Sequence, residues 1–232
     1  MSATPPTAPA ASAPPIAARS VSGMDLELEL LDPSCVPLFR LFRHPNADWD
    51  ETPVAYRNER VDPPAGHKTD FAVLYLGTTL EGVAMECRIL RADYQDHLTW
   101  NRTLAASYQV ARYAFSEPAI FLPIDRGNRR LLGLDAGQRK LGSKIPFQEA
   151  ALALFDRYKD VVHGLSWESM HRNQPARIYA LWHHHKPTIG LTTVPADRNY
   201  PLLPADDTWL TYLRESPEVE GIDDAPPPAA AA

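Results

Sequence analysis

Short apolar runs separated by polar, proline-rich segments dominate this chain and predict strands. Phe71–Leu76 is apolar throughout, which is typical of a central strand covered on both faces. Arg177–Trp182 predicts a second strand, and Met24–Leu31 alternates apolar with acidic residues, as a half-buried strand does. Pro37–Phe42 is a further strand candidate, which Arg40 interrupts. These runs predict a sheet.

Two other segments have helical spacing. Pro146–Val162 predicts an amphipathic helix, because Pro146 suits the first turn and Gly164 suits a terminator. Thr78 or Thr79 can cap a second helix whose apolar face comprises Leu80, Val83, Ala84, Cys87 and Leu90. Residues 98–115 fit helix or strand equally well. The mixture predicts an α+β domain and leaves its topology open.

Proline accounts for 23 of the 232 residues and gathers in the two tails. Residues 1–23 consist mostly of Ala, Pro, Ser and Thr, and residues 214–232 combine acidic residues with prolines and a final alanine run. Both tails lack the large apolar side chains that offset the entropy of ordering. The sequence therefore predicts disordered termini around a single folded domain at residues 24–213.

Charge and cysteine content exclude several classes of protein. The formal net charge of −6 argues against a broad nucleic-acid surface, so no direct nucleic-acid partner is expected. No apolar stretch reaches the roughly 18 residues of a membrane span, and no secretory signal is recognisable. Cys35 and Cys87 provide neither a disulfide framework nor metal-ligand spacing. A cytoplasmic protein is expected.

Four arginines, Arg40, Arg43, Arg57 and Arg60, form the first candidate for chemistry. Arginine within an apolar run, as in Leu-Phe-Arg-Leu-Phe, is costly to bury unless it meets an anion. Its planar guanidinium matches phosphate or carboxylate with two parallel hydrogen bonds. The same pattern also fits an internal ion pair with one of the chain's own acidic residues.

Three more candidates lie further along the chain. Glu86 borders the apolar face of its predicted helix, where a carboxylate can reach a cleft or remain solvated. Tyr75 can stack on a planar ring or belong to the core. Ser169 can bind a ribose or phosphate, or cap its own turn. His183 and His185 could face one metal, but no carboxylate or cysteine lies at ligand spacing, so no metal is expected.

The order of these motifs resembles the RES domain, a family named for its Arg, Glu and Ser. Leu-Phe-Arg ends at Arg40, and Arg-Val-Asp-Pro-Pro begins at Arg60. Leu-Tyr-Leu-Gly-Thr-Thr then contains Tyr75, with Glu86 eleven residues later, and Gly-Leu-Ser-Trp-Glu-Ser ends at Ser169. The resemblance covers residues 36–182. Two positions depart from the family pattern, Trp167 in place of Tyr and Met170 in place of Arg, and Arg172 lies out of register for that arginine.

The resemblance implies a fold like that of the diphtheria-type ADP-ribosyltransferases and an enzyme that consumes NAD by hydrolysis or phosphorolysis. It implies a toxin paired with an Xre-like antitoxin. Arg40, Arg60 and Tyr75 would bind NAD, with Arg43 or Arg57 as an alternative or additional arginine. Glu86 would stabilise the cationic ribose in the transition state, and Ser169 would hold the substrate. The acceptor stays open between water, phosphate and a protein side chain, as does a catalytically inert RES-like module.

Overall fold

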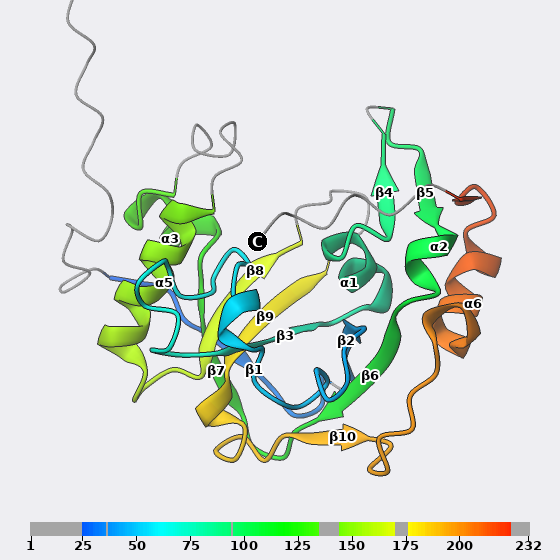
Figure 1. Ribbon diagram of the computed structural model, residues 1–232. Helices are drawn as coiled ribbons and strands as arrows, with labels where there is room; N and C mark the ends of the chain where they lie inside the picture. Colours follow the sequence, from blue (N-terminus) through cyan, green and yellow to red (C-terminus); the bar gives the residue numbers. More distant parts are fainter. Residues whose placement is uncertain (1–24, 36, 94, 135–143, 170–175, 224–232) are drawn as a thin grey trace, which may run out of the picture.

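A curled sheet organises the molecule in the computed structural model (Figure 1). The structure describes residues 25–35, 37–93, 95–134, 144–169 and 176–223. Within them, eight strands form one sheet in the order β1-β7-β8-β9-β3-β2-β6-β10. The strands are β1 (Glu29–Leu31), β2 (Leu38–Phe42), β3 (Val73–Gly77), β6 (Gln109–Ala114), β7 (Ala119–Pro123), β8 (Gly164–Glu168), β9 (Arg177–Trp182) and β10 (Thr192–Val194).

The centre of the sheet confirms the strand predictions made from apolar runs. β3 lies between β9 and β2, and its Leu74 and Leu76 are buried. β3 pairs with β9 along its whole length, with Tyr75 opposite Ala180. By contrast, β2 and β3 share only the pair Phe39 and Gly77. The two strands therefore separate beyond that pair, which leaves room for a side chain between them.

Helices cover the sheet in two groups, which pack into two of the three hydrophobic core clusters. α5 (Ile145–Tyr158) begins with proline in its first turn, close to the prediction, and its Phe155 stacks on Phe71 with ring centroids 4.6 Å apart. α1 (Leu80–Glu86) packs beside Phe39 and Leu41 together with Trp209 of α6 (Asp207–Glu215). α2 (Arg102–Ala105) and α3 (Arg126–Leu131) are shorter. The α+β class is therefore confirmed. None of the described helices meets the length and apolarity that a membrane span requires.

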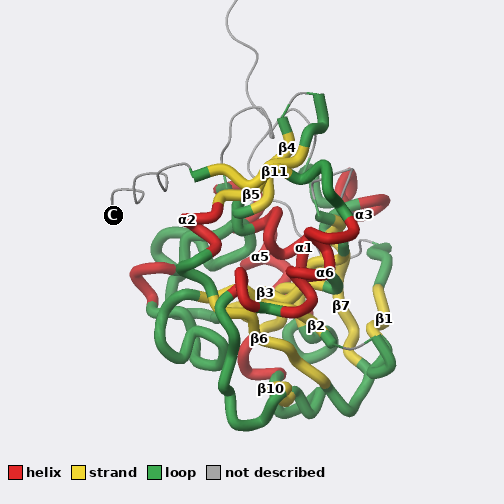
Figure 2. Tube along the Cα trace, turned by 90° about the vertical axis from the view of Figure 1, so that its right-hand side faces the viewer, coloured by secondary structure: helices red, strands yellow, loops and turns green. Residues whose placement is uncertain are grey.

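A second, smaller sheet corrects the predicted end of the domain. β11 (Glu220–Ile222) runs parallel to β5 (Leu98–Asn101), which pairs in turn with β4 (Leu90–Ala92), at the opposite end of the molecule from β10 (Figure 2). The predicted boundary at Leu213 falls inside α6. Residues 214 and 215 thus belong to α6 and residues 220–222 to β11, a strand that is fixed by its pairing with β5 and that the sequence alone does not indicate. The predicted tail at residues 1–23 lies outside the described residues.

Two other element boundaries differ from the prediction. The helix predicted to reach Leu90 ends at Glu86, because Arg88 adopts a positive φ of 59° and the chain reverses into β4. The strand predicted from Met24 comprises only Glu29–Leu31, and Leu30 is 66% exposed. The ambiguous stretch 98–115 divides into β5, α2 and β6.

Candidate functional site

Glu86 and Ser169 meet at the end of α1, as two of the sequence motifs predict. Ser169 directly follows β8, and its backbone amide donates to the carbonyl of Ala176 at 2.7 Å. Its hydroxyl donates to Glu86 Oε1 at 3.3 Å. Ser169 is buried, whereas Glu86 is exposed at the C-terminal end of its helix. The Glu86 carboxylate is therefore exposed to solvent, and the buried Ser169 hydroxyl restrains it by a hydrogen bond.

The start of α1 explains why Glu86 reaches this position. The Thr79 side chain caps the helix by accepting from the amide of Gly82 at 3.1 Å. An added Cβ at Gly82 would lie 2.2 Å from the Cβ of Ala176, which is too close for two non-bonded carbon atoms. Glycine thus allows α1 to lie directly against the strand that follows Ser169.

Tyr75 occupies the middle of β3 and contacts Asp62 and Trp167, each of which belongs to one of the quoted motifs. Its hydroxyl donates to Asp62 Oδ1 at 2.9 Å, and its ring meets Trp167 edge-on with centroids 6.2 Å apart. Burial and the adjacent Asp62 carboxylate raise the pKa of Tyr75 well above its usual value. Tyr75 therefore remains a neutral phenol at physiological pH, and Trp167 occupies the place beside it.

Arg40 fills the gap that opens between β2 and β3. Its Nε donates to the carbonyl of Ala47 at 3.0 Å and its Nη1 to the carbonyl of Tyr75 at 3.2 Å. Neutral carbonyl partners leave the charge of the half-buried Arg40 side chain uncompensated by these two bonds. Arg40 thus lies beside the backbone of Tyr75.

Cys87 directly follows α1 and is the neighbour of Glu86 in the chain. Burial raises its pKa to about 12, and Arg40, Glu86, Glu59 and Arg43 all act on it through space. The thiol is consequently unreactive at neutral pH.

Arg43 and Arg60 each lie over an aromatic ring. The guanidinium of the exposed Arg43 is 5.8 Å from the centroid of Tyr108, and that of the partly exposed Arg60 is 5.3 Å from the centroid of Phe147 on α5. Contacts of this kind hold a guanidinium plane against a ring.

Arg57 is excluded as a substrate arginine. It is buried, and its donors are directed to the carbonyls of Thr52 at 2.7 Å and Phe71 at 2.8 Å. Its Nη2 forms an ion pair with Glu51 at 2.7 Å. Arg57 therefore holds the loop before β3 together. This corrects its inclusion among the alternatives for binding NAD, since burial and saturation leave it no route to a ligand.

The histidine run forms a short 3-10 turn at His183–His185 directly after β9. His183 is buried, neither of its ring nitrogens forms a hydrogen bond, and burial together with the charges of Lys186 and Arg40 lowers its pKa to about 3. Within the described part of the chain, no group of three His, Cys, Asp or Glu side chains has an arrangement suited to a metal ion. His183 and His185 therefore receive no support as a metal centre.

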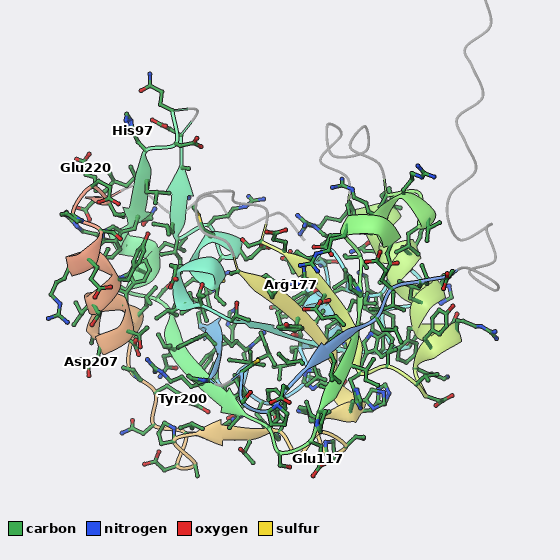
Figure 3. All side chains as sticks on the ribbon, turned by 180° about the vertical axis from the view of Figure 1, so that it is seen from behind. His97, Glu117, Arg177, Tyr200, Asp207 and Glu220 are labelled. Atoms are coloured by element: carbon green, nitrogen blue, oxygen red, sulfur yellow. The ribbon has the colours of Figure 1, made fainter. Side chains whose placement is uncertain are left out.

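A second polar cluster, which the sequence did not predict, lies on the other face of the sheet. We call it the Arg177 cluster. Arg177 Nη1 donates to Asp125 at 2.7 Å, and its Nη2 donates to Ser166 Oγ at 3.0 Å and also to Glu29. Tyr179 donates to Glu29 at 3.0 Å. Arg177 is the first residue of β9 and is labelled in Figure 3, which shows the molecule from behind.

Alternation along β8 separates the two clusters. Ser166 belongs to the Arg177 cluster, and the next residue, Trp167, contacts Tyr75. Successive side chains of a strand point to opposite faces, so the clusters lie back to back across the sheet. Met170 and Arg172, named above for their departures from the family pattern, fall outside the described residues.

Comparison with known proteins finds no family model, no curated protein and no solved structure that matches this chain. The resemblance to the RES domain therefore depends on the quoted motifs and on the geometry of their residues.

Proposed function

We propose that this protein is an enzyme that consumes NAD by cleaving the bond between nicotinamide and ribose. One observation carries the proposal: Ser169 and Glu86, from motifs far apart in the sequence, are joined by a hydrogen bond of 3.3 Å. A supporting observation is the hydrogen bond of 3.2 Å between Arg40 Nη1 and the Tyr75 carbonyl.

The proposed roles follow from the charges that develop during the reaction. Arg40 and Arg60, with Arg43, bind the pyrophosphate of NAD, which carries two negative charges. Tyr75 packs against the nicotinamide riboside. As the glycosidic bond lengthens, positive charge develops on the ribose, and the Glu86 carboxylate stabilises that charge. The Ser169 hydroxyl fixes one oxygen of Glu86, so the carboxylate is oriented before the substrate arrives.

The proposal extends to the fold and the partner that the resemblance implies. We propose that the curled sheet is a variant of the ADP-ribosyltransferase fold and that an Xre-like antitoxin covers the site. The exposed position of Glu86 supports the second point, because a partner surface can reach that carboxylate directly.

Purified protein incubated with NAD, with and without phosphate, tests the proposal. We expect release of nicotinamide, with free ADP-ribose in water or a phosphorylated ADP-ribose when phosphate is the acceptor. Glu86→Gln removes the charge and keeps the shape, so nicotinamide release should fall at least about 100-fold. Glu117→Gln, at an exposed position far from the site (Figure 3), is the matched control.

Three results would contradict the proposal. Intact NAD after incubation would favour the inert RES-like module. Transfer of labelled ADP-ribose to a protein would assign the runner-up activity of a protein ADP-ribosyltransferase. Unchanged nicotinamide release by Glu86→Gln would remove Glu86 from the reaction.

A further inference from the structure

The first turn of α5 contacts the loop that carries Arg60. Lys144, Phe147 and Gln148 have the spacing i, i+3 and i+4, which places their side chains on one face of the helix. Their partners are three consecutive residues of the loop before β3, namely Asn58, Glu59 and Arg60. One turn of helix therefore holds one turn of loop, and the roles assigned above do not explain this correspondence.

Two of these contacts hold the backbone of the loop. The Gln148 side-chain amide donates to the Glu59 carbonyl at 2.9 Å, and Lys144 Nζ donates to the Asn58 carbonyl at 2.9 Å. Lys144 also forms an ion pair with the Glu59 carboxylate at 2.7 Å, but both side chains are exposed, so this pair adds little. Gln148 is buried, and a buried amide is costly without its partner. Its bond therefore fixes the carbonyl directly before Arg60.

The third contact holds the Arg60 side chain. Its guanidinium carbon lies 5.3 Å from the centroid of the Phe147 ring. Phe147 is buried in the core cluster that also contains Phe71 and Trp167, so its ring cannot easily turn away. Arg60 itself is partly exposed. A ring fixed in the core thus restricts the orientation of a long side chain that reaches solvent.

The other side of the same loop turn is anchored to β3. Asp62 accepts from the Glu59 amide at 2.7 Å and from the Tyr75 hydroxyl at 2.9 Å. Val61, the residue after Arg60, is buried in the core cluster that α5 covers. Arg60 therefore lies between two anchors from distant parts of the chain, and a displacement of its backbone would disturb the contacts with one of them.

We propose that Gln148 and Phe147 are positioning residues that fix Arg60 for the pyrophosphate of the substrate. The inference rests on the proposed function and adds α5 to the site. A guanidinium binds phosphate through two parallel hydrogen bonds, which requires a defined orientation of its plane. A side chain that is ordered before the substrate arrives also loses less entropy on binding. Gln148 and Phe147 therefore act on the affinity for the pyrophosphate and leave the cleavage step unchanged.

Nitrogen-15 NMR of the arginine Nε–H groups tests the geometry without any ligand. The Arg60 signal is assigned by its loss in Arg60→Lys. Phe147→Leu removes the ring current and should shift this signal, whereas Phe147→Tyr keeps the ring and should preserve its position. Gln148→Met keeps the length of the side chain and removes the donor, so the loop should relax and the signal should shift. An Arg60 signal that is unchanged in Phe147→Leu and Gln148→Met would overturn the proposal.

Inhibition by ADP-ribose and turnover of NAD test the role. ADP-ribose contains the pyrophosphate and no nicotinamide, so its inhibition constant reports on binding without the cleavage step. Phe147→Leu and Gln148→Met should each raise this constant and KM for NAD about 3- to 10-fold, and change kcat less than about twofold. Phe147→Tyr should behave like the wild type. In an Arg60→Ala background, neither substitution should have a further effect. Asp156→Asn, at an exposed position of α5, is the control.

The two experiments separate two kinds of failure. A shifted Arg60 signal in a protein that neither cleaves NAD nor binds ADP-ribose would sink the proposed function and the assignment of the pyrophosphate, while the contact between α5 and Arg60 would stand. Turnover of NAD with KM and the inhibition constant unchanged in Phe147→Leu and Gln148→Met would keep the enzyme and refute the role of α5. A fall in kcat alone, or the same losses in the Arg60→Ala background, would make Gln148 and Phe147 structural residues only.

Discussion

The two faces of the central sheet carry clusters of the same residue types with different degrees of closure. The Arg177 cluster contains an arginine, a serine, a tyrosine and two carboxylates, and its members bond mainly to one another. The candidate site also has arginine, serine, tyrosine and glutamate. Its Glu86 is exposed, and the single bond between Ser169 and Glu86 is longer, at 3.3 Å.

This difference shows that residue type alone does not identify a site. In the Arg177 cluster the carboxylate of Glu29 accepts from Arg177, Ser166 and Tyr179, so little capacity remains for a ligand. Although burial opposes it, these bonds lower the pKa of Glu29. A saturated cluster of this kind ties strands together. The candidate site differs in that its Glu86 is exposed and its Arg40 donates to backbone carbonyls.

Removing Arg177 should have the largest effect on folding. Arg177→Ala leaves Glu29 and Asp125 facing each other, both with side chains only 19% exposed. We expect the free energy of unfolding to fall by about 3–5 kcal/mol, measured by denaturant titration. Arg130→Ala, at an exposed position of α3, should change it by less than about 0.5 kcal/mol. A fall below about 1 kcal/mol for Arg177→Ala would mean that the cluster is not a structural tie.

His183 is a buried polar residue that belongs to neither cluster, and we expect it to make the stability of the protein depend on pH. Its pKa is about 3 in the folded protein, compared with 6.5 for an unperturbed histidine. Between these values the unfolded chain binds more protons, so stability decreases as the pH falls below 6.5. The loss from this residue should be about 2 kcal/mol between pH 6.5 and pH 5.

Denaturation of His183→Leu as a function of pH measures this contribution. The variant should lose less stability than the wild type over the same interval, because leucine does not titrate. Parallel curves would show that His183 does not resist protonation. The lowered pKa of Glu29 acts in a more acidic window, where stability is lost as the pH falls through its folded-state value, so the two effects can be separated.

Ser169→Ala should have the smallest effect on stability and a clear effect on activity. The variant loses one hydrogen bond to an exposed carboxylate, so nicotinamide release should fall about 10-fold while the free energy of unfolding changes by about 1 kcal/mol or less. Ser166→Ala is the matched control on the other face, where stability should fall and nicotinamide release per folded molecule should not. The opposite pattern would exchange the roles assigned to the two clusters.

The sequence predicted the parts of the fold in which periodicity and burial agree. Leu38–Phe42 and Arg177–Trp182 form strands because their apolar residues are buried against neighbouring strands. Local sequence patterns did not predict the strands whose formation depends on pairing with residues far away in the chain. β11 has only three residues, and its pairing with β5 fixes it as a strand. Leu90 fits a helix by spacing but starts β4, since the chain reverses at Arg88.

The site was predictable to a similar degree. The motifs indicated Glu86, Ser169, Tyr75 and Arg40, and hydrogen bonds join these residues in two pairs, Glu86 with Ser169 and Arg40 with Tyr75. The sequence could not show that Arg57 donates its hydrogen bonds to backbone carbonyls of the loop. Asp62 stood inside a quoted motif, but its burial and its bond to Tyr75 depend on how the loop folds over β3.

The pairing of β3 with β9 has a consequence for how the chain reaches its native state. The strand that carries Tyr75 is joined to its neighbour through residues such as Ala180, which belong to a much later part of the chain. Closing so large a loop costs entropy before any contact rewards it. Assembly should therefore take milliseconds to seconds, and Tyr75 and its neighbours on β9 should reach their final positions in the same late, cooperative event.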